Sequence, residues 1–286
     1  MIILNCKELA NRIKKSVASD IKRLLPTPPS LVVVMVGNNA ASLSYISHKE
    51  KACKQVGIAF QKIELAENAT QTKLNQTIKA LSEDSSVNGI LLQLPLPKQL
   101  SATEAISYLN PKKDVDGLTE NNIGKLVLGS PDAIVPCTVK GILVLLKDYS
   151  KEYNYELSGK HVVIINRSNL VGKPLSQLLL QENATVTICH SQTLNLKAYT
   201  QAADILISAT GQKHFIDNNH IKTGSILIDV SIIHQNNQIF GDINPSSVAS
   251  KAAALTPVPG GIGPLTVASL LQNIVQAHRL QNNINI

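Results

Sequence analysis

Two side chains with complementary chemistry stand four residues apart in the first third of the chain. Tyr45 and Lys49 fall within residues 42–55, whose pattern predicts a helix, so a phenol and an ammonium group project from one face. Partial burial or a neighbouring cation would lower the pKa of Lys49 and leave some neutral amine to accept a proton. The pair therefore suits acid/base work on one ligand. On spacing alone, an exposed helix with ordinary solvated lysines explains the same residues.

Polar side chains also follow a buried strand that is predicted over residues 89–94. Gln93 lies near its end, at the carboxyl edge where ligands of α/β proteins bind. An amide there orients a lysine without neutralising it, or it satisfies the backbone of a loop. Asp114 and Asp116 lie in a polar loop, where such side chains bind a divalent cation, bind an amino-substituted heterocycle or cap a turn. No third carboxylate or histidine stands nearby, so no metal site is predicted.

A second candidate site follows the β-branched run 161–165, which predicts a buried parallel strand. A helix is predicted to begin at Gly172, and Asn166, Arg167 and Ser168 lie between the two elements. The N-terminus of a helix offers unpaired N–H groups to a pyrophosphate, so this junction is typical of dinucleotide binding. Gly172 fits the close approach of helix to strand. The glycine fingerprint is incomplete, however, because Asn166 stands where the tight-turn glycine is usual.

The residues that follow the later strands of this half indicate whether the dinucleotide is NAD or NADP. Folds that prefer NAD usually place an acidic residue at the end of the second strand, predicted here at 184–188. The residues that follow are Cys-His-Ser, without a carboxylate, so Arg167 and Ser191 favour a 2′-phosphate and hence NADP. The loops at 208–211 and 229–231 follow the next two strands and suit the nicotinamide end. Each of these loops is also an ordinary βα turn.

The chain alternates between predicted strands and helices twice, and this order predicts parallel sheets. The first series consists of helices at 6–25, 42–55, 72–81 and 103–109 and strands at 30–36, 58–65 and 89–94. The second consists of helices at 138–149, 172–182 and 195–201 and strands at 161–165, 184–188, 204–208 and 225–230, before a closing helix at 265–280.

We therefore predict an α/β fold of two α/β domains with a cleft between them. Residues 1–120 form the first domain, which the C-terminal helix at 265–286 joins, and residues 121–264 form the second. The second domain is predicted as a Rossmann-type doubly wound parallel sheet. Residues 256–263 are too rich in proline and glycine for regular structure, and residues 118–136 show a mixed pattern.

Composition narrows the class of partner. The chain has 286 residues, of which 44% are hydrophobic, and no apolar run approaches the roughly 20 residues of a membrane span. No secretory signal or CxxC pair is present, which predicts a cytoplasmic protein. The net charge of +7 suits a small polyanionic ligand or simply aids solubility. An aromatic content of 3% without long basic runs argues against nucleic acid.

Five segments resemble, in order and nearly end to end, the bifunctional methylenetetrahydrofolate dehydrogenase/methenyltetrahydrofolate cyclohydrolase family. They are ASLSYISHK at 41–49, GILLQLPLP at 89–97, KDVDG at 113–117, RS at 167–168 with VGKP at 171–174, and TPVPGGIGP at 256–264. The resemblance implies NADP-dependent oxidation of 5,10-methylenetetrahydrofolate and hydrolysis of the methenyl product to 10-formyltetrahydrofolate. It also implies a place in one-carbon metabolism and purine biosynthesis, and a homodimer formed largely through the nucleotide domains.

The same resemblance assigns roles to residues. Lys49 would be the general acid/base of the hydrolysis, Gln93 would hold and tune it, and Tyr45 would pack against the folate. Asp116 would bind the amino group of the pterin. The remaining folate contact is Pro264, and the cofactor contacts are Asn166, Arg167, Ser168, Ser191 and Ser231.

Three positions depart from the family pattern: Asn166 and Ser231 stand where glycine is usual, and Val139 replaces a proline. A side chain in place of glycine blocks close backbone approach or demands an awkward φ. One alternative is therefore a cyclohydrolase with weak dehydrogenase activity, and another is a non-catalytic NADP-binding sensor. A short-chain dehydrogenase is disfavoured, because its nucleotide turn precedes its Tyr/Lys pair and the order is reversed here.

Overall fold

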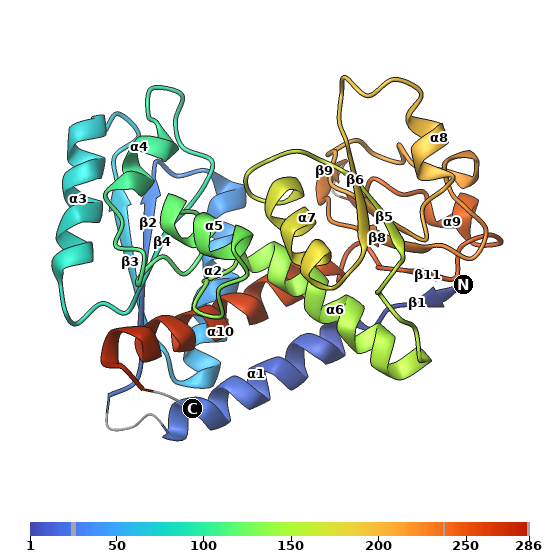
Figure 1. The fold of residues 1–286 in the computed structure, drawn as a ribbon. Coiled ribbons are helices and arrows are strands. Elements are labelled where there is room, and N and C mark those ends of the chain that lie inside the picture. Colours follow the sequence, from blue (N-terminus) through green and yellow to red (C-terminus); the bar gives the residue numbers. More distant parts are fainter. Residues whose placement is uncertain (24–26, 237, 285–286) are drawn as a thin grey trace. The chain divides into compact units, whose positions relative to one another are not determined.

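The computed structural model describes residues 1–23, 27–236 and 238–284 (Figure 1). The chain divides into two compact units, each built around its own parallel sheet. The three-stranded unit comprises Asn11–Cys137 and Val267–Ile286, and the six-stranded unit comprises Met1–Ala10 and Thr138–Thr266. The helices α1 (Cys6–Arg23) and α10 (Ile262–Asn282) each contribute residues to both units. The helix expected to reach Leu25 is described as far as Arg23.

The sheet of the three-stranded unit has the order β3-β2-β4, and all its pairs are parallel. Its strands are β2 (Ser30–Val36), β3 (Ala59–Leu65) and β4 (Gly89–Leu92). Residues 31–36 of β2 are all buried, as expected for the central strand of a covered parallel sheet. The predicted parallel order of this half is confirmed.

Capping residues fix where the helices of this unit begin. Asn39 accepts a hydrogen bond from Ser42 N at the start of α2, and Gly57 ends that helix in the left-handed conformation. Thr119 caps α5 in the same way, by accepting from Asn122 N at 3.4 Å. The helices are α2 (Ala40–Val56), α3 (Gln71–Glu83), α4 (Ala102–Ser107) and α5 (Glu120–Val127). The sequence pattern missed α5, although Thr119 followed by Glu120 is a signal for a helix start.

The sheet of the six-stranded unit is wholly parallel and has the order β1-β11-β8-β7-β5-β6. Its strands are β1 (Ile2–Ile3), β5 (His161–Ile165), β6 (Thr185–Cys189), β7 (Ile205–Ser208), β8 (Ile226–Asp229) and β11 (Ala254–Leu255). The chain passes from β5 to β6 on one side and then crosses to β7 on the other. The predicted doubly wound sheet is confirmed, and its topological switch point lies between β5 and β7.

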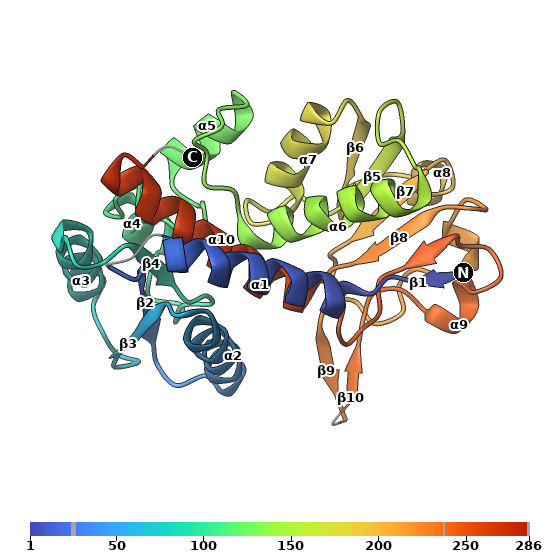
Figure 2. The ribbon, with the colours of Figure 1, turned by 90° about the horizontal axis from the view of Figure 1, so that it is seen from below.

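Helices connect these strands, and one hairpin projects away from the sheet (Figure 2). The helices are α6 (Cys137–Tyr153), α7 (Gly172–Gln181), α8 (Leu196–Thr200), the 3-10 turn η1 (Asn218–His220) and α9 (Pro245–Val248). The hairpin pairs β9 (Ile233–Gln235) with β10 (Gln238–Phe240) and was not predicted. The prediction of irregular structure over 256–263 is wrong at its end, because α10 begins at Ile262.

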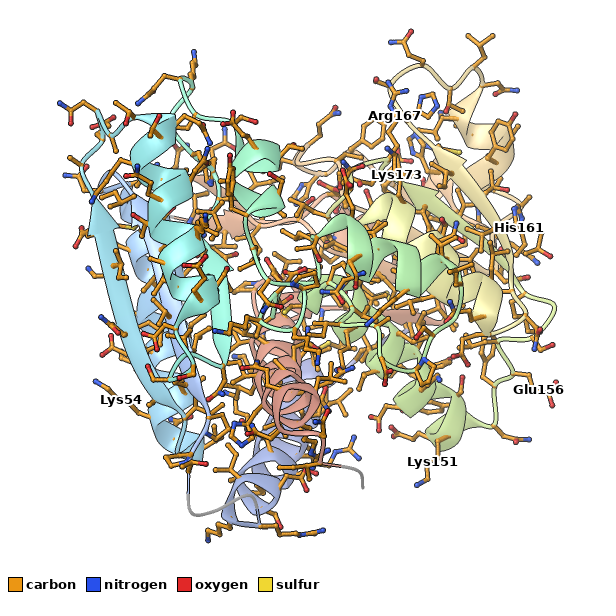
Figure 3. The ribbon with its side chains drawn as sticks, turned by 60° about the vertical axis from the view of Figure 1, so that its left-hand side comes forward. Lys54, Lys151, Glu156, His161, Arg167 and Lys173 are labelled. Carbon is orange, nitrogen blue, oxygen red and sulfur yellow. The ribbon has the colours of Figure 1, made fainter. Side chains whose placement is uncertain are left out.

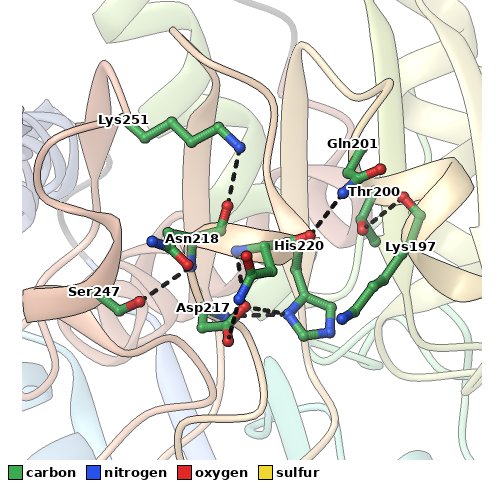
Figure 4. Close-up of polar contacts among 9 residues, drawn as sticks. Lys197, Thr200, Gln201, Asp217, Asn218, His220, Ser247 and Lys251 are labelled. Carbon is green, nitrogen blue, oxygen red and sulfur yellow. Dashed lines mark hydrogen bonds and ion pairs between the residues drawn. The ribbon is translucent and has the colours of Figure 1, made fainter.

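Hydrogen bonds join η1 to the segments that contain Gln201 and Lys251 (Figure 4). Asp217 and His220 form a capping box, in which the His220 Nδ1 to Asp217 Oδ1 distance is 2.6 Å. Lys251 Nζ donates to Asn218 O at 2.9 Å, and Gln201 Nε2 donates to Asn219 O at 2.8 Å. The Asp–His pair is thus engaged in holding a turn.

Candidate active site

The three-stranded unit brings Lys49 of α2 against Gln93, which directly follows β4. Lys49 Nζ donates to Gln93 Oε1 at 2.9 Å, and Gln93 Nε2 donates to Leu94 O at 2.7 Å. Because the amide nitrogen is committed to a carbonyl, the amide oxygen must face the lysine. The backbone N–H of Gln93 is fixed as well, by a 2.8 Å bond to Val34 O in the central strand. Gln93 therefore orients Lys49 and satisfies its own loop.

The surroundings of Lys49 prepare its amine for proton transfer. Burial lowers the pKa of Lys49 below its ordinary value, and the carboxylate of Asp116 opposes this shift by favouring the ammonium form. Burial also raises the pKa of the nearby Cys53 thiol to about 12, which keeps that group neutral at ordinary pH. A half-buried lysine in this setting has more neutral amine near neutral pH than a solvated lysine.

The charge of Asp116 gives a testable pH dependence. Replacing Asp116 by Asn removes the nearby negative charge that stabilises protonated Lys49, so the pKa of Lys49 falls further. If neutral Lys49 is the working form, the rising limb of the hydrolysis rate against pH moves to lower pH in Asp116→Asn. A pH–rate profile at saturating substrate measures this shift. A limb that stays in place or moves to higher pH would exclude electrostatic control of Lys49 by Asp116.

Tyr45 lies one turn before Lys49 on α2 and is 39% exposed. Partial burial raises the pKa of Tyr45, so its hydroxyl remains protonated and can donate a hydrogen bond. Its ring offers a flat apolar surface beside the lysine. This arrangement suits a planar ligand held against α2.

The charged residues of the loop 113–117 have two different roles: Lys113 and Asp114 stabilise the local fold, and Asp116 influences Lys49. Lys113 Nζ donates to Asp84 O at 2.6 Å, just after α3. The buried carboxylate of Asp114 accepts from Thr119 N, Thr119 Oγ1 and Asn122 Nδ2. Asp114 therefore caps a turn, whereas Asp116 is the aspartate whose charge favours the ammonium form of Lys49. Within the described residues, no three His, Cys, Asp or Glu side chains cluster as a metal would require.

The turn after β5 in the six-stranded unit is organised by the side chain of Asn166. Its Oδ1 accepts from Ser168 N at 2.8 Å and from Gly172 N at 3.0 Å, and its Nδ2 donates to Ala209 O at 2.8 Å. Asn166 does not have a positive φ, so the expectation of an awkward backbone is wrong. Any side chain at Gly172 would collide with the backbone of Asn166, which supports the predicted close approach.

Arg167 and Ser191 leave the sheet from neighbouring strands. Ile165 and Cys189 are partners in the register of β5 and β6, and Arg167 and Ser191 each follow two residues later. Both side chains are exposed. Figure 3 shows Arg167 with Lys173 at the opposite end of β5 from His161. A guanidinium and a hydroxyl at this edge fit a phosphate on the ribose of a dinucleotide.

The turn after β8 carries Ser231. Its Oγ accepts from Gly211 N at 3.1 Å, and its N–H donates to Asp229 Oδ1 at 3.1 Å. Burial raises the pKa of Asp229 to about 6. The half-buried Pro264 lies in the first turn of α10, within the six-stranded unit, whereas Lys49 and Gln93 belong to the three-stranded unit. Val139 is fully buried in α6.

Sequence reasoning missed Asp242, which organises the turn after β7. Its carboxylate is fully buried and accepts from Ser208 Oγ at 2.7 Å, Thr210 N at 2.6 Å and Gln212 N at 3.0 Å. Asp242 follows the hairpin that was itself not predicted. In the sequence, the position of Asp242 directly after Gly241 is a weak sign that it organises a turn.

No helix in the described ranges is long and apolar enough to cross a membrane.

The fold and the site define a two-domain α/β protein of the nucleotide-dependent enzyme class. One unit has a doubly wound sheet with a helix N-terminus after β5, and the other has the lysine–glutamine pair. Two family models match the chain. One describes the tetrahydrofolate dehydrogenase/cyclohydrolase catalytic domain, over residues 4–116, and the other the NAD(P)-binding domain, over residues 136–282. The chain belongs to the tetrahydrofolate dehydrogenase/cyclohydrolase family.

Individual relatives agree with this placement. Bifunctional protein FolD of Thermodesulfovibrio yellowstonii is 46% identical over 285 residues, covering 99% of this chain and 98% of the relative. The crystal structure of the bifunctional FolD enzyme of Campylobacter jejuni superposes with a TM-score of 0.94 at 38% identity, covering 99% and 100% of the two chains. The Trypanosoma brucei enzyme, solved with NADP cofactor and inhibitor, gives a TM-score of 0.91 at 30% identity, with 99% of each chain covered.

Proposed function

We propose that this protein oxidises 5,10-methylenetetrahydrofolate with NADP⁺ and hydrolyses the resulting methenyl compound to 10-formyltetrahydrofolate, within one-carbon metabolism. The observation that carries the proposal is the 2.9 Å bond from Lys49 Nζ to Gln93 Oε1, beside Asp116. Membership of the family and the folate and NADP chemistry in the names of relatives support it.

Lys49 acts in the hydrolytic half of this proposal. Water adds to the electrophilic methenyl carbon, and the neutral amine of Lys49 takes one of its protons. The bond from that carbon to one ring nitrogen then breaks, and the lysine returns the proton to the departing nitrogen. The added oxygen releases its remaining proton to solvent as it becomes the formyl carbonyl. Gln93 keeps the amine aimed throughout, because its oxygen accepts from Nζ while its own N–H group is held by Leu94 O. Asp116 binds the pterin amino group, and Tyr45 and Pro264 contact the folate.

The six-stranded unit holds the cofactor in the oxidative half. NADP, when bound, accepts a hydride from the methylene carbon of the folate. Arg167 and Ser191 hold the 2′-phosphate, because they leave adjacent strand ends and are both exposed. Asn166, Ser168 and Ser231 shape the turns that receive the pyrophosphate and nicotinamide ends. The fit is supported by Gly172, where a side chain would not be accommodated.

The domain assignment belongs to the same proposal. Residues 1–120 with 265–286 bind folate, and residues 121–264 bind NADP. The catalytic-domain match over 4–116 supports the first range, and the grouping of Val267–Ile286 with the three-stranded unit supports its C-terminal part. We further propose a cytoplasmic homodimer that binds neither nucleic acid nor membranes. The four cysteines are buried and none of them forms a disulfide, which agrees with a reducing compartment.

The proposal is tested by two absorbance assays on one preparation of the wild-type protein. NADP⁺ reduction with 5,10-methylenetetrahydrofolate and separate hydrolysis of the methenyl compound are both expected. Hydrolysis without NADP⁺ reduction would favour the cyclohydrolase with weak dehydrogenase activity. NADP⁺ binding without turnover in either assay would favour the sensor and contradict the proposal.

A further inference from the structure

The side chain of Asn166 links the two βα turns that flank the topological switch point. Its Oδ1 closes the turn after β5 through Ser168 N and Gly172 N, and its Nδ2 reaches Ala209 O in the turn after β7. The strands β5 and β7 are adjacent in the sheet. Ligands of doubly wound sheets bind where such turns diverge. Asn166 therefore adds a side-chain link between the turn after β5 and the turn after β7.

The hydroxyl of Ser231 makes the next connection along the same edge. Ser231 Oγ accepts from Gly211 N, which again belongs to the turn after β7, and Ser231 itself lies in the turn after β8. Asp229 Oδ1 accepts from Ser231 N, and Asp229 Oδ2 accepts from Ile243 N at 2.8 Å. Ser231 is thus fixed by the buried carboxylate of Asp229, and its hydroxyl in turn binds Gly211.

The turn after β7, which both contacts share, is itself held by a buried carboxylate. Asp242 accepts from Ser208 Oγ, Thr210 N and Gln212 N, so the residues on both sides of Gly211 are fixed by one buried carboxylate. The turn after β6 differs. Its side-chain bonds within the described chain stay inside it, as Thr193 Oγ1 accepts from His190 N and His190 Nδ1 accepts from Gln192 N.

We propose that Asn166 and Ser231 are positioning residues that hold the turns after β5, β7 and β8 as one platform for the pyrophosphate and nicotinamide parts of the dinucleotide. This inference rests on the proposed NADP-dependent function. The platform leaves out the turn after β6, which carries Ser191. Asn166 also holds the turn that carries Arg167, whereas the contacts of Ser231 lie outside that turn. Both residues therefore set the affinity for NADP⁺ and for NAD⁺, and Ser231 leaves the preference between the two unchanged. Both act through the turn after β7, so their effects are coupled.

The test measures dissociation constants for NADP⁺ and NAD⁺ by calorimetry in Asn166→Ala, Ser231→Ala and the double variant. Losing net hydrogen bonds predicts about 10–100-fold weaker NADP⁺ binding in Asn166→Ala and about 3–10-fold in Ser231→Ala. NADP⁺ affinity in the double variant should fall by less than the product of the two single effects. Each residue acts through the turn after β7, so removing one contact reduces what the other contributes. In Ser231→Ala, the binding of NAD⁺ should weaken by the same factor as the binding of NADP⁺. Ser231→Thr, which keeps the hydroxyl, should restore binding.

Gln201→Ala is the matched control. It also removes an amide that donates to a backbone carbonyl at 2.8 Å in the same unit, yet Gln201 acts on η1. It should leave both dissociation constants unchanged. In Asn166→Ala and Ser231→Ala, by contrast, the KM for NADP⁺ should rise together with its dissociation constant.

Several outcomes would overturn the platform. Unchanged or tighter binding in both single variants would do so. Multiplicative effects in the double variant, or a changed NADP⁺/NAD⁺ ratio in Ser231→Ala, would do so as well. If Asn166→Ala does not fold, the Ser231→Ala and Ser231→Thr pair decides, since the Ala variant alone should lose affinity. Absence of NADP⁺ binding in the wild-type protein would instead refute the proposed function.

Discussion

Lys49→Met should lose hydrolysis of the methenyl compound by about a hundred- to ten-thousand-fold, which is the usual contribution of a positioned proton-transfer group. Met fills a similar volume but cannot carry a proton. Lys49→Arg should be similarly inactive, because a guanidinium stays protonated and cannot serve as a base. Both variants should still bind NADP⁺, since the cofactor residues belong to the other unit. Hydrolysis rates at saturating substrate, with NADP⁺ affinity measured in parallel, check the expectation.

Lys54→Met provides the control for that experiment. Lys54 lies on the same helix but is exposed and pairs with Glu50 across one helical turn. Such surface pairs contribute little to stability, so this variant should keep wild-type hydrolysis. Wild-type hydrolysis in Lys49→Met as well would exclude Lys49 as the acid/base.

Arg167→Gln combined with Ser191→Asp should change the preference for the dinucleotide. The first change removes a charge-assisted contact to the 2′-phosphate, and the second places a carboxylate where NAD-binding folds hold the ribose hydroxyls. A lost bond to a charged group predicts a rise of about 10–150-fold in the KM for NADP⁺. The KM for NAD⁺ should fall or stay unchanged. Initial rates of methylenetetrahydrofolate oxidation with each dinucleotide measure the ratio.

Lys151→Gln makes the same change in net charge as Arg167→Gln and serves as its control. Lys151 is exposed near the end of α6, away from Arg167 in the same unit (Figure 3). It should leave the NADP⁺/NAD⁺ ratio at the wild-type value. An unchanged ratio in the double variant would refute the assignment of the 2′-phosphate to Arg167 and Ser191.

Strong local patterns made much of the fold predictable. The observed bounds of β2 and β5 are those expected from their β-branched runs, because strands buried on both faces are uniformly apolar. The proximity of Lys49 and Gln93 could be anticipated from a helix and a strand end of one α/β series. The sequence also indicated the need for glycine at Gly172, which the structure explains by the backbone of Asn166.

Other features depend on contacts between segments that no local pattern encodes. The hairpin β9–β10 is short and only partly buried, so its pattern is weak. As a replacement for glycine, Asn166 was expected to block close backbone approach or to demand an awkward φ. Instead its carboxamide fills the turn with hydrogen bonds, one of which reaches Ala209, 43 residues away. The separate roles of Asp114 and Asp116 likewise follow from partners such as Asn122, which the spacing of the two residues does not reveal.

The central claim is that Lys49 is an amine of lowered pKa held by Gln93. Titration of the lysine side-chain nitrogens by ¹⁵N NMR in the folded wild-type protein tests it most directly. The Lys49 signal, identified by its absence from Lys49→Met, should titrate clearly below the ordinary value of about 10.4. If the Lys49 signal titrates with the solvated lysines, the account of the hydrolytic site is contradicted.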